Sequence, residues 1–250
     1  MAETGMDDWR KVLEHLEAGA ERILATLAGL TDARLREPSA LPGWTRGHVV
    51  THVARNADSL WNLLEWARTG REIPQYPSLA ARNAALEAGA GRGVAEQAAD
   101  LRDSAARFVE QARALPEEAA RARVRAMAGW EHPAWYAVYR RWHEVEAHHV
   151  DLAAGYGPAD WPDAYVRWAL RETLDGLVGL PPGGQGSLAG YRLVSTDSGD
   201  GVALGDGPEA TGSSRALLAW LSGRSRGAGV VVRGEGTPPV PPPWPPPARF

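Results

Sequence analysis

Three side chains of this sequence have the types and the spacing that could hold a divalent metal ion. Glu144 and His148 are four residues apart in the segment WHEVEAHHVDL, which spans 142–152. On a helix, residues with this spacing point the same way, about one turn apart, so a carboxylate and an imidazole could bind one metal ion from a single face. A third ligand must come from elsewhere in the chain, and His52 is the best candidate.

The same pair has a simpler interpretation. A glutamate and a histidine at this spacing often share a solvated helix face, so Glu144 and His148 alone leave metal binding and plain solvent exposure both open. The neighbouring histidines are predicted to have other roles. His149 lies in the apolar stripe of the segment and is predicted to be a core residue, whereas His143 is predicted to be exposed.

Two helices must position the candidate ligands. Thr45 is a plausible N-cap for a helix through about Ala67, and this helix carries His52. The second helix is expected over 133–154, from a proline that suits the first turn to the residue before a glycine. On both helices the candidate ligands fall at the margin of the apolar stripe. Such margins can border a cleft in a bundle, where metal sites use side chains from facing helices.

Apolar residues at helical spacing continue through the first 155 residues. They predict further helices over 7–29 and 78–114, with the glycine-rich stretch 89–93 as a candidate interruption of the latter. Residues 121–131 could form an extended connection. We therefore predict a four-helix bundle over 1–155 as the metal-binding domain.

The rest of the chain has a different pattern. It contains a predicted helix over 161–180, β-like runs over 191–196 and 230–233, and a short helix over 214–221 between them. These elements predict a small α/β domain over 156–236. Residues 237–250 are proline-rich and predict a tail that is mobile or lies on the surface. The predicted fold class is therefore α+β.

Composition excludes several classes of function. The net charge of −4 argues against nucleic acid and against a polybasic membrane patch as partners, and no apolar run is long enough to span a membrane. The acidic N-terminal stretch 1–8 lacks a secretory hydrophobic segment, so a cytoplasmic protein is expected. The sequence has no cysteine, which excludes disulfides, thiolate metal ligands and a cysteine nucleophile. A thiol used in catalysis would have to come from a small molecule.

The order and spacing of several motifs resemble a known family, the mycothiol-dependent maleylpyruvate isomerases and their relatives within the wider DinB-like helix-bundle metalloenzymes. The resemblance covers nearly the whole chain. Its strongest pieces are LPGWTRGHVVTH at 41–52, RNAD at 55–58, WARTG at 66–70, RNAALEAGA at 82–90, EVEAHHVDL at 144–152 and LLAWLSGR at 217–224. Each piece is only moderately specific, and the specificity lies in their combination.

The resemblance implies a zinc ion held by His52, Glu144 and His148, and mycothiol as the thiol cofactor. It implies a bundle followed by a C-terminal domain similar to sterol-carrier folds. It also implies that Arg224 reaches the active site and, together with Arg82, holds substrate carboxylates. From the residues alone, Arg224 follows a helix end that an arginine commonly contacts, and Arg82 is by default a solvated charge.

The implied reaction converts maleylpyruvate to fumarylpyruvate by reversible thiolate addition. Two alternatives remain open: a mycothiol S-transferase that acts on another electrophile, and a non-catalytic binding module of the same fold. The complete set of candidate ligands argues against the binding module. The same ligands also suit iron or nickel. The expected partners are a small electrophile and a low-molecular-weight thiol, and the expected state is a monomer or weak dimer.

Overall fold

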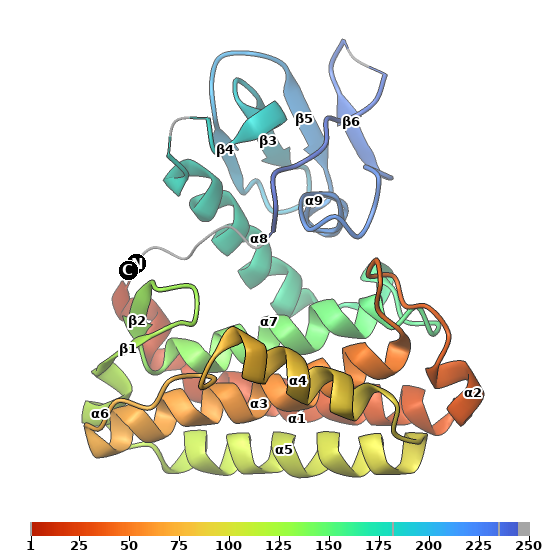
Figure 1. Cartoon of the computed structure of the whole chain (residues 1–250). Helices are drawn as coiled ribbons and strands as arrows, with labels where there is room; N and C mark the ends of the chain where they lie inside the picture. The colour runs from red at the N-terminus through yellow and green to blue at the C-terminus, as the bar shows by residue number, and fades with distance from the viewer. Residues whose placement is uncertain (1, 182, 235, 245–250) are drawn as a thin grey trace. The chain divides into compact units, whose positions relative to one another are not determined.

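The computed structural model describes residues 2–181, 183–234 and 236–244, with side chains from Trp9 onward. The chain divides into two compact units, Met1–Tyr156 and Gly157–Arg249. The first is helical and the second combines helices with a small sheet, so the predicted α+β class is confirmed (Figure 1). Within the described residues, no helix combines the length and the apolarity that crossing a membrane would require.

Four long helices form the bundle of the first unit (Figure 1). They are α1 (Ala2–Ala28), α3 (Arg46–Thr69), α5 (Val94–Ala114) and α7 (Tyr136–Asp151). Helix α3 packs against both α5 and α7, and α1 packs against the same two helices. Shorter helices complete the unit: α2 (Asp32–Leu35), α4 (Leu79–Ala90), which packs on α3, and α6 (Glu117–Arg121).

The start of α3 follows from its capping residues. The Thr45 hydroxyl accepts a hydrogen bond from the His48 backbone N–H, and the His48 ring accepts one from the Thr45 N–H, which satisfies two free donors at once. The predicted N-cap is therefore confirmed. The helix runs two residues beyond the expected end at Ala67, because the turn closes at Gly70, whose positive φ of 70° suits glycine.

One predicted helix interruption is confirmed and one helix start was wrong. The helical stretch predicted over 78–114 is two helices, α4 and α5, which separate at the glycine-rich stretch as expected. Pro133 does not open α7, because it ends strand β2 (Glu131–Pro133), which pairs antiparallel with β1 (Arg123–Arg125). This hairpin occupies much of the connection predicted over 121–131 and delays the start of α7 to Tyr136.

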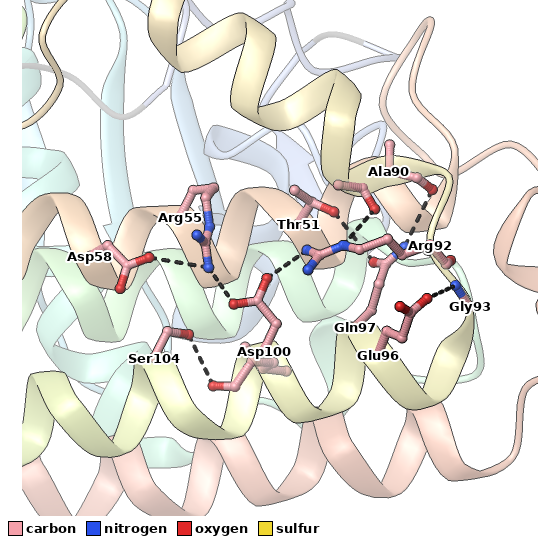
Figure 2. Close-up of polar contacts among 12 residues, drawn as sticks. Thr51, Arg55, Asp58, Ala90, Arg92, Gly93, Glu96, Gln97, Asp100 and Ser104 are labelled. Carbon is pink, nitrogen blue, oxygen red and sulfur yellow. Dashed lines mark hydrogen bonds and ion pairs between the residues drawn. The ribbon is translucent and has the colours of Figure 1, made fainter.

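A cluster of ion pairs joins α3 to α5 (Figure 2). The Asp100 carboxylate of α5 pairs with Arg55 of α3 and, at 2.5 Å, with Arg92 from the turn between α4 and α5. Arg55 also pairs with Asp58 at 3.1 Å, one turn along α3. Each of these four side chains has an opposite charge beside it, which favours a structural role for the cluster.

The second unit has a four-stranded sheet in the order β4-β3-β5-β6. Its strands are β3 (Arg192–Ser195), β4 (Gly201–Ala203), β5 (Glu209–Gly212) and β6 (Val230–Val232). Strands β3 and β5 are parallel, and the other two pairs are antiparallel. Strands β4 and β5 were not predicted, because they are short and contain glycine rather than an apolar run.

Two helices pack with this sheet, α8 (Asp163–Gly179) and α9 (Ser214–Leu221). Single turns of 3₁₀ helix, η1 (Pro158–Asp160) and η2 (Gly186–Leu188), lie in the connections. The core contains leucines of α8 and α9 together with apolar residues of the strands, among them Leu170, Leu174, Leu193, Leu217, Trp220 and Val232.

The described part of the proline-rich tail lies against the second unit. The Trp220 indole N–H donates to the Pro239 carbonyl at 2.9 Å, and the Trp244 indole N–H donates to the Thr173 hydroxyl at 3.0 Å. The Ser187 hydroxyl donates to the Val240 carbonyl. Residues 245–250 of the predicted tail lie outside the described residues.

Candidate metal site

Helices α3 and α7 bring together the three residues that were predicted as ligands. His52 lies in the second turn of α3, and Glu144 and His148 lie one turn apart on α7. The Glu144 Oε2 atom lies 3.0 Å from His52 Nε2 and 3.1 Å from His148 Nε2. One ligand atom from each residue falls within 4.8 Å of the others, so this group could hold a metal ion.

The spacing of these donor atoms is slightly tighter than a bound zinc ion requires. Zinc–ligand bonds of about 2.0–2.1 Å in tetrahedral geometry place neighbouring donors about 3.3 Å apart. The two distances from Glu144 Oε2 are only a few tenths of an ångström shorter. Small side-chain rotations on fixed helices would therefore suffice, and the two imidazoles with one carboxylate are ligands that zinc commonly takes.

Asp151 orients the ring of His148. Its buried carboxylate, 3% exposed, lies 2.8 Å from His148 Nδ1, on the side of the ring away from Glu144. A proton on Nδ1 therefore donates to Asp151, so loss of the Nε2 proton would leave the Nε2 lone pair directed toward Glu144 and His52. Metal-bound histidines commonly have such an outer carboxylate, which fixes the tautomer and raises the basicity of the ring.

The electrostatics of the cluster keep Glu144 ionised and His52 neutral. Burial raises the pKa of Glu144, but hydrogen bonds from His148 and His52 outweigh it and hold this pKa well below its usual range. Burial lowers the pKa of His52, and the hydrogen bond to Glu144 offsets this only in part. Burial lowers the pKa of His148, but its hydrogen bonds to Asp151 and Glu144 outweigh this and raise that pKa. A metal ion requires the carboxylate and neutral imidazoles, so metal binding would displace a proton from His148.

Two further side chains, Trp44 and Arg82, act on His52. The half-buried Trp44, at the turn before α3, lies edge-on to the His52 ring with centroids 5.5 Å apart. The positive charge of Arg82, on α4, contributes to the lowered pKa of His52, so this guanidinium is near enough to act on the cluster. Its Nη1 donates to the Asn83 side chain at 3.1 Å.

Arg224 belongs to the second unit, just past the end of α9. Its backbone N–H donates to the Ala219 carbonyl at 2.8 Å, and its Nη1 donates to the Ser222 carbonyl at 2.8 Å. Its guanidinium lies 4.8 Å from the ring centroid of Trp244. These contacts agree with the helix-end interaction expected of an arginine at this place, and its role in catalysis stays a prediction.

Of the predictions for the two neighbouring histidines, one is confirmed and one was wrong. His149 is a core residue, as predicted: it is 2% exposed, hydrogen-bonds with the Thr26 hydroxyl at 2.8 Å and stacks on Tyr156 with centroids 3.7 Å apart. The predicted exposure of His143 was wrong. This residue is half-buried, because neighbouring segments also cover the side of α7 that lies away from the apolar stripe.

Two charged residues near the site were missed by the sequence analysis. Asp151 lies three residues after His148, and Arg140 lies four residues before Glu144, so both follow helical spacing from a candidate ligand. The Glu144 charge partly offsets the effect of burial, which lowers the pKa of Arg140. The signal was therefore present in the sequence, but helical spacing alone does not show which charged neighbours turn toward a site.

Comparison with known proteins places this geometry in a family. The model of the mycothiol maleylpyruvate isomerase N-terminal domain matches residues 16–153, more than half of the chain and all three candidate ligands. The chain belongs to the mycothiol-dependent maleylpyruvate isomerase family. A crystal structure of a mycothiol-dependent maleylpyruvate isomerase is 31% identical, with a TM-score of 0.83 over 94% of this chain and 97% of that one.

A second crystal structure shows a mutant of that isomerase with a histidine replaced by alanine, and it matches with the same identity, coverage and TM-score. No curated protein sequence shows significant similarity to the chain. The isomerase-family match extends through the second unit, since it covers nearly the whole of both chains. The family is thus one of enzymes, and in this member three side chains that could hold a metal ion converge.

Proposed function

We propose that this protein is a zinc- and mycothiol-dependent cis–trans isomerase that converts maleylpyruvate to fumarylpyruvate. The observation that carries the proposal is the convergence of His52, Glu144 and His148 within 4.8 Å, in a chain that belongs to the isomerase family. The proposal includes a small-molecule substrate, a low-molecular-weight thiol, a cytoplasmic location, and a monomer or weak dimer.

The three ligands would leave at least one coordination position of the metal open, which is typical of catalytic rather than structural zinc. Zinc bound there would supply the positive charge that keeps a coordinated thiol deprotonated near neutral pH. Glu144 contributes a negative charge that its hydrogen-bonding partners keep ionised. Asp151 holds the His148 ring by its Nδ1 atom, so Nε2, after loss of its proton, would direct its lone pair toward the metal ion.

Mycothiol would supply the sulfur, whose addition turns the cis double bond into a single bond free to rotate and whose elimination leaves the trans product. The absence of cysteine supports this division, because the chain has no thiol of its own to offer. Arg82 would bind a substrate carboxylate, and its influence on the pKa of His52 supports a position near the reacting atoms. We propose Arg224 as a second carboxylate-binding residue.

The direct test follows the absorbance of maleylpyruvate in the presence of zinc-loaded protein and mycothiol, with a panel of other electrophiles measured alongside. His52→Ala should abolish both zinc retention and isomerisation, while the helical circular dichroism of the bundle persists. His143→Ala is the matched control, because it removes a nearby imidazole that lies outside the donor cluster. Isomerisation by metal-free protein would contradict the proposed chemistry. Turnover of other electrophiles but not of maleylpyruvate would show that the enzyme acts on a different substrate.

A further inference from the structure

The first unit contains a cavity of about 400 Å³ between α1, α5 and α7. Its apolar lining comes from all three helices and includes Leu16, Ala20, Leu24, Phe108, Val109 and Val145. None of the three candidate metal ligands contributes to it. The volume falls within the range of small-molecule binding sites, which combine an apolar lining with a few polar groups.

A buried arginine contributes the unusual part of this lining. Arg141 is only 1% exposed, and its Nη1 donates to the Val53 carbonyl at 2.6 Å and to the Asn56 side-chain oxygen at 3.1 Å. Both acceptors are uncharged. Its Nη2 is shielded from solvent and has no hydrogen-bond partner among the residues that the structure describes.

A positive charge in this position is costly unless an anion accompanies it. Burial lowers the pKa of Arg141 to about 10, an effect that the charges of Glu144 and Asp58 offset only in part, and the guanidinium stays charged at neutral pH. An uncompensated buried charge and an unpaired donor both destabilise a fold. A carboxylate would satisfy both needs, because its two oxygens match the planar fork of a guanidinium.

The mouth of the cavity carries charges that are already paired or exposed. Glu17 and Arg113, which contribute to the lining, form an ion pair with each other at 2.9 Å. Arg102, also in the lining, is exposed to solvent. Glu21 and Glu110 of the lining are also exposed to solvent. Water and neighbouring charges therefore satisfy the rim, whereas the buried Arg141 keeps an Nη2 donor without a hydrogen-bond partner among the described residues.

We propose that this cavity binds a small amphipathic carboxylate, with Arg141 as its ion-pair partner and the apolar side chains around it in contact with its hydrocarbon part. The site is separate from the metal cluster, and the proposal does not depend on the isomerase reaction. It predicts a ligand class defined by one carboxylate and a short apolar chain.

Octanoate is a suitable probe, and calorimetric titration of the full-length protein measures its binding. Octanol and octylammonium, which have a similar chain but no carboxylate, should bind at least tenfold more weakly, a difference of about 1.4 kcal/mol. Because a carboxylate could also bind an open zinc position, the titration uses both zinc-loaded and metal-free protein. We expect equal octanoate affinity in the two forms, and binding confined to the zinc-loaded form would overturn the proposal.

Variants locate the ligand. Arg141→Met should weaken octanoate binding at least tenfold, whereas Arg102→Met, the matched loss of an arginine from the rim, should leave it unchanged. If Arg141→Met does not fold, Ala105→Leu fills the cavity from a half-buried position and should also abolish binding. No binding to the unmodified protein, undiminished binding to Arg141→Met, or undiminished binding to Ala105→Leu would each overturn the assignment.

Discussion

Two clusters of charged and polar side chains include residues of helix α3. Both have a carboxylate between two nitrogen-containing groups, but these groups differ in their chemistry. In one, the Glu144 carboxylate lies between the imidazoles of His52 and His148. In the other, the Asp100 carboxylate lies between the guanidiniums of Arg55 and Arg92 (Figure 2). Each carboxylate thus bridges two nitrogen groups from different parts of the bundle.

The difference between the two clusters lies in the lone pairs of their nitrogen atoms. An imidazole can be neutral and donate a lone pair to a metal, whereas a guanidinium stays protonated and offers only N–H donors. The Asp100 cluster is therefore complete as it stands and can only hold helices together. In the Glu144 cluster the same kind of hydrogen bond can be exchanged for metal coordination, so its residues can serve chemistry.

The largest effect is expected from removal of the central charge of the first cluster. Glu144→Gln should weaken zinc binding by more than about 100-fold, because even an outer-sphere partner of a ligand is worth roughly 10- to 100-fold. Competition with a chromophoric chelator measures this affinity. Unchanged zinc affinity in this variant would show that Glu144 is not a metal ligand, and the proposed difference between the two clusters would be wrong.

A smaller effect is expected from Asp151, which touches His148 rather than the metal. Asp151→Asn should weaken zinc binding roughly 10- to 100-fold, because the His148 ring loses the acceptor that fixes its tautomer. The same chelator competition provides the measurement. A loss as complete as that of Glu144→Gln would show that Asp151 is itself a ligand.

Removal of the central charge of the second cluster should alter stability instead. Asp100→Asn leaves two guanidiniums without their shared partner, and we expect the free energy of unfolding to fall by about 1–3 kcal/mol, since the Asp100 side chain is 16% exposed. Denaturant unfolding measures this change. Zinc affinity should stay that of the unmodified protein, and its loss would link the two clusters.

His132 extends the comparison to an imidazole beside a guanidinium. Its Nδ1 lies 2.8 Å from the Pro133 carbonyl, and its Nε2 lies 2.9 Å from Arg140 Nη1, so the neutral ring both donates and accepts. Burial, reinforced by the Arg140 charge, lowers the pKa of His132 from 6.5 to about 3. At mildly acidic pH, His132 is therefore protonated in the unfolded chain but stays neutral in the folded protein.

This difference sets the sign of the pH dependence. The stability contributed by neutral His132 is present above about pH 6.5 and is lost as the pH falls toward 3. His132→Gln should reduce the slope of unfolding free energy against pH by about 1.4 kcal/mol per pH unit between roughly pH 4 and 6. Denaturant unfolding at several pH values measures the slope, and an unchanged slope would mean that folded His132 takes up the proton.

The sequence predicted the parts of the site that depend on short-range rules. The spacing of Glu144 and His148 follows from the helical repeat, and the start of α3 at Thr45 follows from its capping chemistry. The start of α7 was wrong, because the pairing of Pro133 in a hairpin depends on another strand. The missed strands β4 and β5 likewise depend on partners rather than on their own residues.

By itself the sequence determined which residues could act as ligands, because side-chain chemistry and helical periodicity are local properties. Only the tertiary structure decided which of them meet. His52 and Glu144 are separated by 92 residues, and the packing of α3 against α7 brings their side chains to 3.0 Å. The same packing encloses Arg141 beside a cavity and leaves His143 half-buried. Burial and long-range contact arise from all the neighbouring elements together, so no single segment encodes them.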